Sequence, residues 1–183
     1  MKNKAYNLNT YTFAFGEQVF VDTNIWLYLF PSPQNPRSRF AGKYSTAFSD
    51  LLRAKAQPIL DPMVLSEYLN RYSRIEWEGL YRSSFPKFKG FRKSQDFTNV
   101  ALSAKAFVSR MLSFCQIHDT PASDLDLAQA LNDFATGQID FNDAVILDVC
   151  KKHNFKLLTN DSDFQTGGIE VLTTNPALLR ACP

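Results

Sequence analysis

Residues 18–29 read QVFVDTNIWLYL and contain the first strand that we expect in this chain. The run Gln18–Asp22 has the composition of a short buried strand, and an apolar segment resumes after Thr23 and Asn24. A hydrophobic strand that ends on a carboxylate has two explanations. Asp22 either caps the following helix or is held at the strand tip for chemistry.

Strands and helices alternate along the rest of the chain. Further strands are expected at Pro58–Leu60, Phe155–Thr159 and Ile169–Leu172, with helical periodicity between them. This alternation is typical of an α/β fold with a parallel sheet.

The length of 183 residues suits one domain of ordinary size. We expect an N-terminal extension over residues 1–16, a single domain over residues 17–175 and a C-terminal tail over residues 176–183. Residues 78–97, EGLYRSSFPKFKGFRKSQDF, are basic and aromatic and are interrupted by Pro86 and Gly90. They are expected to form an insertion or a helical arm within the domain.

Composition excludes several classes of protein. No apolar run approaches the roughly 18–20 residues that span a bilayer, and the N-terminus lacks the apolar stretch of a signal peptide. A cytoplasmic location, without membrane contact, is therefore expected. The three cysteines are widely spaced and form no CxxC pair, which argues against a disulfide framework or a zinc site.

The net charge of +2 hides a strong asymmetry. Residues 119–150 contain aspartates but neither lysine nor arginine, so they could hold cations. Residues 71–93 are basic and could face a polyanion. On charge alone, solvated helix faces are the favoured explanation of both segments. The basic residues are Arg71, Arg74, Arg82, Lys87, Lys89, Arg92 and Lys93.

Four carboxylates from distant segments are expected at one edge of the sheet. Asp22 ends the first strand, and Asp161 follows the strand that begins at Phe155. Asp143 lies in the first turn of the preceding helix, and Glu67 near the second turn of the helix after Leu60. Ligands of open parallel sheets bind outside the carboxyl ends of the strands, so these side chains should share one crevice.

Each carboxylate alone has a structural explanation as a cap, a surface residue, a partner of the helix dipole or a turn residue. Together they would repel one another and shift their pKa values unless a cation lies between them. Mg²⁺ and Mn²⁺ prefer carboxylate and water oxygens. No histidine or cysteine lies among these positions, which argues against zinc.

The motifs VFVDTN, VLSEYL, DFNDAVI and LLTNDSDF resemble the acidic motifs of PIN-domain nucleases, in the order of that family. The group most similar to this chain is the VapC-type toxins of bacterial toxin–antitoxin systems, and the resemblance covers about Gln18 to Leu172. It implies a three-layer PIN-like fold with a parallel sheet of order 3-2-1-4-5. It also implies cleavage of RNA, a VapB-type antitoxin as partner and a homodimer. This chain is longer than a typical VapC toxin.

The resemblance also implies roles for single residues. Asp22, Glu67, Asp143 and Asp161 become the catalytic residues and the ligands of one or two Mg²⁺ or Mn²⁺ ions, with Asp163 as an auxiliary ligand. Thr23, Asn24, Thr159 and Asn160 become the polar residues that order the site. Apart from the resemblance, the charge of the basic residues in the segment 71–93 makes them candidates for RNA binding. The expected products are a 5′-phosphate and a 3′-hydroxyl.

Three other functions compete with this one. A HAD-type phosphatase needs a second aspartate two residues after the first, and position 24 is asparagine. A non-catalytic PIN scaffold usually lacks part of the acidic set, which this chain keeps. A PIN nuclease of RNA processing stays open, because only the genomic neighbourhood separates it from a toxin.

Overall fold

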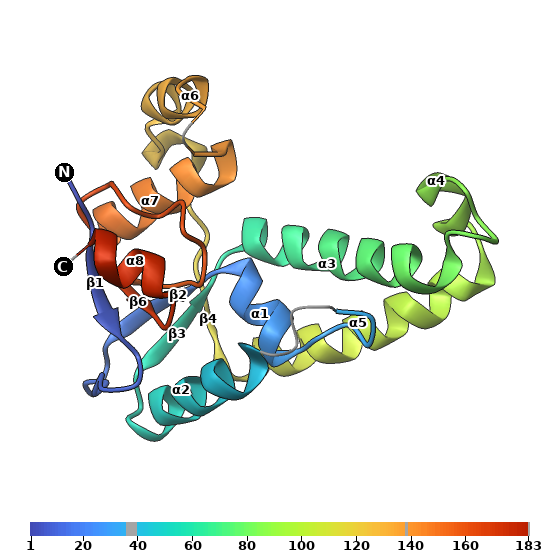
Figure 1. Cartoon of the computed structure of the whole chain (residues 1–183), viewed down its shortest axis with the longest axis horizontal. Coiled ribbons are helices and arrows are strands. Elements are labelled where there is room, and N and C mark those ends of the chain that lie inside the picture. The colour runs from blue at the N-terminus through green and yellow to red at the C-terminus, as the bar shows by residue number, and fades with distance from the viewer. Residues whose placement is uncertain (36–39, 138, 183) are drawn as a thin grey trace.

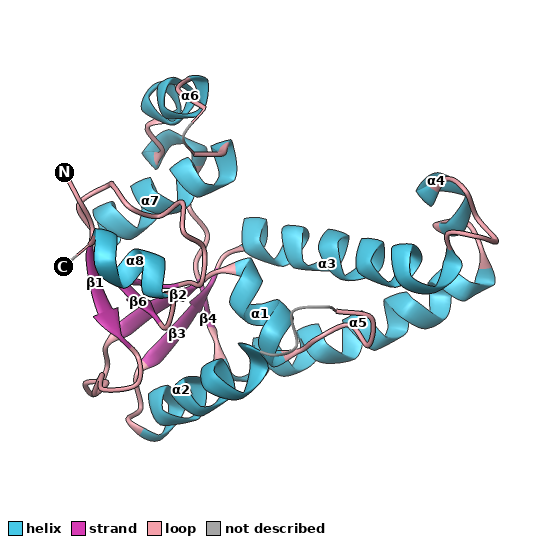
Figure 2. Ribbon diagram, in the orientation of Figure 1, coloured by secondary structure: helices cyan, strands magenta, loops and turns pink. Residues whose placement is uncertain are grey.

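A six-stranded sheet forms the centre of the computed structural model, which describes residues 1–35, 40–137 and 139–182. Every strand pair in it is parallel, and helices flank the sheet (Figures 1 and 2). The spatial order is β1-β6-β5-β2-β3-β4. The strands are β1 (Lys4–Asn7), β2 (Gln18–Val21), β3 (Gln57–Leu60), β4 (Gln116–Ile117), β5 (Lys156–Leu158) and β6 (Glu170–Thr173).

The predicted strand order is confirmed for five of these strands. Counted from β2 as the first strand, the order β4-β3-β2-β5-β6 is 3-2-1-4-5. The sheet differs from the prediction by its sixth strand, β1, which pairs with β6 at the edge. Residues 1–16 therefore contribute a strand to the sheet instead of only preceding it. In the expected C-terminal tail, Pro176–Ala181 forms helix α8, while Pro183 lies outside the described residues.

The central strands are buried on both faces, as the neighbouring helices require. Val19, Phe20 and Val21 of β2 and Leu157 and Leu158 of β5 are fully buried. Strand β2 ends at Val21, one residue earlier than predicted, and Asp22 takes the N-cap position of the next helix. The first expected strand therefore delivers Asp22 to the carboxyl edge of the sheet.

The helices connect these strands in chain order. Helix α1 packs between α2 and α3, and α6 packs against α7. No helix in the described ranges is both long enough and apolar enough to cross a membrane. The remaining bounds are α1 (Thr23–Leu29), α2 (Ala41–Arg53), α3 (Pro62–Glu76), α4 (Phe88–Phe91), α5 (Gln95–Phe114), α6 (Leu127–Ala135) and α7 (Phe141–His153). A 3₁₀ turn, η3, covers Ala122–Asp124.

Helices α3 and α5 form an arm that projects away from the sheet (Figure 1). Helix α3 begins where the Asp61 side chain accepts a hydrogen bond from the Met63 amide at 2.7 Å, with Pro62 in the first turn. It continues into a π-helical turn, η2 (Trp77–Tyr81). Helix α4 follows at the end of the arm, and α5 returns to the sheet. We call residues 77–97 the tip of the arm.

Aromatic rings form the interior of the tip. Phe91 is fully buried, and its ring centre lies 4.8 Å from that of Tyr81 and 5.6 Å from that of Phe97. The rings of Trp77 and Phe88 meet edge to face at 5.6 Å. Aromatic side chains in a basic segment can either stack on bases or pack inside the protein. Their mutual contacts favour packing.

The N-terminal residues are fastened to the loop that follows β5. The Asn3 side chain is buried, donates to the Phe164 carbonyl at 3.1 Å and accepts from the Ile169 amide at 3.0 Å. The Gly167 amide donates to the Met1 carbonyl at 3.0 Å. The loop 164–169 is thus held from the opposite end of the chain.

Candidate active site

Asp22 stands at the carboxyl end of β2, and its environment answers the question that the sequence raised. Although it occupies the N-cap position of α1, its side chain makes no capping hydrogen bond. Its Oδ2 instead accepts hydrogen bonds from the Asn24 amide and, at 2.6 Å, from the Thr159 hydroxyl. The carboxylate is therefore oriented by the neighbouring strand tip rather than used to cap its own helix.

Of the four residues predicted to order the site, Asn24 and Thr159 contact this carboxylate. The Asn24 amide also donates to the Thr159 hydroxyl at 3.1 Å, and Asn24 Oδ1 accepts from the Asn160 backbone amide at 3.1 Å. Thr23 reaches the other way and donates to Glu67 Oε2 at 3.1 Å. The tips of β2 and β5 are thus joined to helix α3 by side-chain hydrogen bonds.

Glu67 lies on α3 at the base of the arm and has two partners. Besides the hydroxyl of Thr23, it pairs with Arg71 one turn later, with 3.0 Å between Oε1 and the guanidinium. The Arg71 side chain is about half exposed, so the ion pair contributes little to stability. Its effect is to hold the Glu67 carboxylate toward the site.

Asp143 lies in the first turn of α7, where Asp140 is the N-cap and accepts from the Asp143 amide at 2.9 Å. The positive end of the helix dipole favours an acidic side chain in this turn. Asp161 follows β5, and its amide donates to the Thr159 hydroxyl at 3.0 Å. Its own Oδ1 accepts from the Asp163 amide at 3.1 Å, so the two residues form one turn.

The four predicted carboxylates interact electrostatically. The pKa of Asp22 is raised to about 7. Burial is the largest cause, and the charges of Glu67 and Asp161 contribute to the increase. Burial likewise raises the pKa of Asp143 to about 8, with contributions from Asp140, Asp22, Asp161 and Glu67. This mutual repulsion agrees with the expectation for carboxylates that share one crevice.

Asp163 lies at the margin of this group. It is largely exposed. The partial burial of its carboxyl group, and after that the charge of Asp161, raise its pKa. It lines a separate hollow that also includes Asp133 and Leu147. Its position fits an auxiliary role better than that of a central ligand.

The acidic group fits a hard divalent cation that keeps part of its water shell. Within the described ranges, no three Asp, Glu, His or Cys side chains form a cluster that could hold a metal as they stand. Hydrogen bonds from Thr23, Asn24 and Thr159 occupy part of the Glu67 and Asp22 carboxylates. Mg²⁺ is commonly bound through one or two carboxylates and several waters, which matches this donor set.

The histidines lie outside the acidic group. His118 and His153 pack against each other with ring centres 4.4 Å apart, and both contact Phe155. Burial and the neighbouring His153 lower the pKa of His118. Their place in a ring cluster indicates a structural role.

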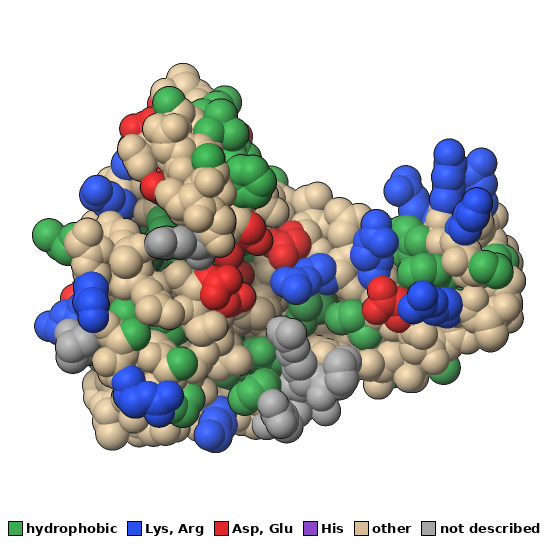
Figure 3. Space-filling model, turned by 45° about the horizontal axis from the view of Figure 1, so that its top comes forward, with side chains coloured by type: hydrophobic (Ala, Val, Ile, Leu, Met, Phe, Trp, Pro, Cys, Tyr) green, Lys and Arg blue, Asp and Glu red, His purple; other side chains and the backbone are tan. Residues whose placement is uncertain are grey.

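The basic residues divide into two groups. Arg71 belongs to the acidic site, whereas the others lie on the tip or beside it. The Arg74 guanidinium lies 4.7 Å from the centre of the Phe88 ring and that of Arg82 5.8 Å from the Trp77 ring. Acidic side chains gather in the hollow at the base of the arm, and basic side chains gather at its far end (Figure 3). The exposed basic residues of the tip are Arg82, Lys87, Lys89, Arg92 and Lys93.

Sequence reasoning missed the residues that fix Asn160. Its side chain donates to the Tyr28 hydroxyl at 3.1 Å and accepts from the Tyr44 hydroxyl at 2.8 Å. Its carbonyl accepts from Asn175 at 2.8 Å. These partners lie on other elements and have no local motif. Asp140 was also missed as a charge near Asp143, although its place before a helix was a usable signal.

The metal-free protein is expected to lose stability as pH rises from about 5 to about 9. Asp22 and Asp143 have folded-state pKa values of about 7 and about 8, above the ordinary aspartate value of 3.8. The folded state therefore binds their protons more tightly, and this stabilisation is lost as pH rises through those values. Urea unfolding in EDTA at several pH values measures the slope.

Two controls check the origin of this slope. Asp143→Asn should flatten the slope above pH 7, whereas Glu170→Gln should leave it unchanged. The pKa of Glu170 is lowered by Tyr6 and Lys156 against the opposing effect of burial, so it titrates below this window. A metal-free protein whose stability rises between pH 6 and pH 8 would contradict the assignment.

Comparisons with known proteins place this geometry in a family context. The model of the PIN domain family matches residues 19–169. A similar solved structure is VapBC2 from Rickettsia felis bound to a DNA fragment from its promoter. It has a TM-score of 0.53 and 17% identity, and the match covers 85% of this chain and 98% of that one. At this identity the likeness concerns the fold.

A second structure, PAE2754 from Pyrobaculum aerophilum, has a TM-score of 0.47 and 16% identity over 96% of this chain and 95% of that chain. The comparison with curated proteins finds no match.

Proposed function

This chain belongs to the PIN domain family, whose members are generally nucleases that use divalent metal ions, and on that premise we propose that it is a metal-dependent ribonuclease. We further propose that it is the toxin of a type II toxin–antitoxin system, restrained by a VapB-type antitoxin. The proposed site consists of Asp22, Glu67, Asp143 and Asp161, with Asp163 as an auxiliary metal ligand. RNA as substrate would place the protein in the cytoplasm, and we propose a homodimer.

One observation carries the proposal of a nuclease. Burial raises the pKa values of Asp22 and Asp143, and the carboxylates that lie on α3 and after β5 add to both increases. A structural role would not call for several like charges at one sheet edge, because each additional carboxylate opposes folding. A bound divalent cation would offset the repulsion between the carboxylates, so cation binding explains why they lie together.

The site residues have two roles in the proposed hydrolysis, which are metal binding and the positioning of a carboxylate. A bound Mg²⁺ or Mn²⁺ ion supplies Lewis acidity that activates water and polarises the scissile phosphate. Asp22, Glu67, Asp143 and Asp161 would hold it. Thr159 and Asn24 keep the Asp22 carboxylate in place. Water adds to phosphorus, the bond to the 3′ oxygen breaks, and a 5′-phosphate and a 3′-hydroxyl remain.

The arm supplies a surface for the RNA backbone. From Glu67 to Arg82 the chain advances along one helix at roughly 1.5 Å per residue, so the tip lies on the order of 20 Å from the acidic site. RNA bound at the site could follow the arm and place its phosphates against Lys87, Lys89 and Arg92. Because the aromatic rings pack inside the tip, we assign this contact to charge rather than to stacking.

Removal of the charges at the tip should weaken RNA binding. The change of Arg82, Lys87, Lys89 and Arg92 to alanine should also flatten the dependence of the affinity on salt, because fewer counterions are released. For single-stranded RNA the steepness of log K against log salt falls by about 0.7 for each phosphate that the protein no longer neutralises. Fluorescence anisotropy at several salt concentrations measures both quantities.

A matched variant controls for net charge. Lys43, Arg53, Lys151 and Arg180 lie on α2, α7 and α8, away from the tip, and their change to alanine removes the same charge. This control should retain most of the salt slope. Equal salt slopes for the two variants would mean that the tip does not bind RNA and would support a protein interface there instead.

Growth and hydrolysis together test the proposed function. Expression of the chain alone should slow growth, co-expression of the antitoxin encoded beside its gene should restore it, and the purified chain should cleave RNA in Mn²⁺ but not in EDTA. RNA cleavage without any effect on growth would support an RNA-processing nuclease. No cleavage with Mg²⁺ or Mn²⁺ would support a non-catalytic PIN module.

A further inference from the structure

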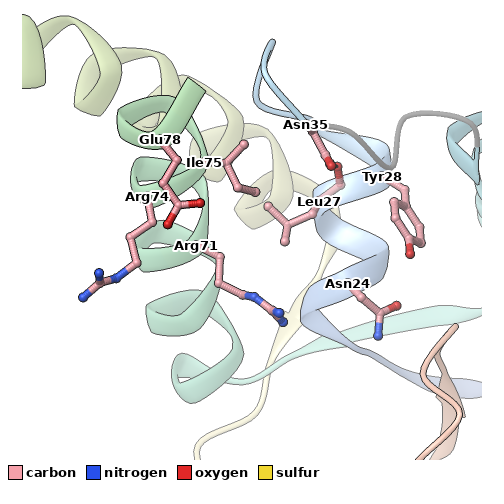
Figure 4. A pocket seen from close by; sticks show the side chains of 8 residues that line it. All are labelled: Asn24, Leu27, Tyr28, Asn35, Arg71, Arg74, Ile75 and Glu78. Atoms are coloured by element: carbon pink, nitrogen blue, oxygen red, sulfur yellow. The ribbon is translucent and has the colours of Figure 1, made fainter. Parts of the chain in front are cut away.

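A cavity between α1 and α3 lies beside the acidic site and has no role in the proposed chemistry. Its volume is about 300 Å³, at the lower end of the roughly 300–1,000 Å³ of small-ligand pockets. Figure 4 shows side chains from both helices around it. Those that bear on its chemistry are Asn24, Leu27, Tyr28, Arg71, Ile75 and Glu78.

The cavity shares two lining residues with a hollow at the acidic site. Asn24 and Tyr28 also line a second hollow, together with Asn160, Asp161 and Ser162. Asn24 contacts the Asp22 carboxylate, and the Tyr28 hydroxyl accepts from the Asn160 side chain at 3.1 Å. A group that fills the cavity therefore lies next to whatever is bound at the acidic site.

The walls suit a flat heterocycle. Leu27 and Ile75 point toward each other from the two helices, while Arg71 extends from α3 toward Asn24 (Figure 4). Arg71 uses one side of its guanidinium for Glu67 and has further N–H donors for a phosphate. An apolar slot with an arginine at its mouth matches a nucleotide, with the base inside and the phosphate at the entrance.

The walls are also held in place before any ligand arrives. Glu76 is buried and accepts from the Ser32 hydroxyl and from the Gln34 amide, which fixes the loop 31–35 against α3. The Asn35 side chain donates to the Leu27 carbonyl at 2.9 Å. A pocket with fixed walls loses little conformational freedom on binding, so it can discriminate between ligands.

Glu78 contributes an acidic side chain to the lining of the cavity. Together with the buried Glu76 it is one of two acidic residues in the basic segment 71–93, and it is exposed. Within the described ranges no hydrogen bond or ion pair to Glu78 is present. A lone carboxylate weakens the attraction of a basic surface for RNA, so its place at the cavity points to a specific contact. Its two oxygens can accept from two adjacent N–H groups, a pattern that guanine presents at N1 and N2.

We propose that this cavity holds a guanine base next to the scissile phosphate, with Glu78 accepting from N1–H and N2–H and Arg71 donating to the adjoining phosphate. This inference rests on the proposed ribonuclease function and names the specificity of that same site. The contact is a charge-assisted pair, which is the kind of hydrogen bond that separates guanine from the other bases most strongly.

Replacement of guanosine by inosine tests the contact with Glu78 independently of cleavage. Inosine keeps N1–H but lacks the N2 amino group, so one hydrogen bond to a charged acceptor is lost. Short RNAs that contain one guanosine or one inosine are titrated against the protein in EDTA. We expect about tenfold weaker binding of the inosine RNA. Glu78→Gln should reduce this ratio to about two or less, because the charged acceptor is gone.

Two further variants make the result specific. Asp96→Asn removes the same charge from the start of α5 and should leave the ratio at about ten. Ile75→Trp fills the cavity and should abolish discrimination even if the charges are intact. Equal binding of both RNAs by the parent, or an unchanged ratio in Glu78→Gln, would overturn the proposal. Failure of cleavage in Mn²⁺ alongside normal discrimination would instead reject the ribonuclease function and keep the guanine site.

Discussion

Asp143→Asn should lower the rate of RNA hydrolysis by about a thousandfold or more, which corresponds to about 4 kcal/mol of transition-state stabilisation. The substitution keeps the size of the side chain and removes a charge that would help to hold the metal. It also leaves the Asp140 cap of α7 intact, since that bond uses the Asp143 backbone amide. Single-turnover cleavage of a labelled RNA in Mn²⁺ measures the loss.

The fold of this variant must be shown to be intact. We expect its metal-free form to be at least as stable as the parent at pH 8, because a buried like charge has been removed. Asp133→Asn removes one charge from α6, outside the acidic group, and should retain nearly full activity. Equal turnover by Asp143→Asn and the parent, with contaminating nucleases excluded, would overturn the site assignment.

Mn²⁺ should stabilise the parent protein by about 2.7 kcal/mol at a concentration a hundredfold above its dissociation constant, because only the folded state brings the carboxylates together. Asp22→Asn should be more stable than the parent in EDTA at pH 8, on the order of 1 kcal/mol, since that pH lies above the pKa of about 7. It should also gain less from Mn²⁺. Urea unfolding of both proteins with EDTA and with Mn²⁺ measures the two effects together.

A distant carboxylate provides the comparison for this experiment. Glu170 accepts from Tyr6 at 2.6 Å and pairs with Lys156 at 3.1 Å, so Glu170→Gln should destabilise the metal-free protein. Its gain from Mn²⁺ should equal that of the parent. If Asp22→Asn behaves in the same way, then Asp22 is a structural residue and the proposed metal site loses its first ligand.

The alternation of elements in the sequence was sufficient to predict a parallel sheet and to bring four distant carboxylates to one edge, because parallel strands share a carboxyl edge and each connecting helix returns to it. The strand order, by contrast, was implied by the resemblance to PIN-domain nucleases. Asp22 and Asp161 follow strands, whereas Asp143 lies in the first turn of its helix and Glu67 near the second turn of another. The prediction that these four carboxylates interact required no knowledge of side-chain geometry.

What could not be predicted depends on contacts between elements. Strand β1 is short, lies at the sheet edge and is only half buried, so it leaves little alternation in the sequence. Strand β4 has two exposed residues and no pattern at all. The hydrogen bonds of Tyr28 and Tyr44 to Asn160 join residues more than a hundred positions apart. No local propensity encodes such a contact.

The pairing of the first strand with the last has a consequence for biosynthesis. Lys4–Asn7 pairs with Glu170–Thr173, so the strand made first stays unpaired until the chain as far as Thr173 has left the ribosome. Such long-range parallel pairing is slow, because the entropy of closing a very large loop is lost before the stabilising contacts form. The same closure fastens Met1 and Asn3 to the loop after Asp161. This edge of the sheet can therefore form only after all four carboxylates of the proposed site have been synthesised.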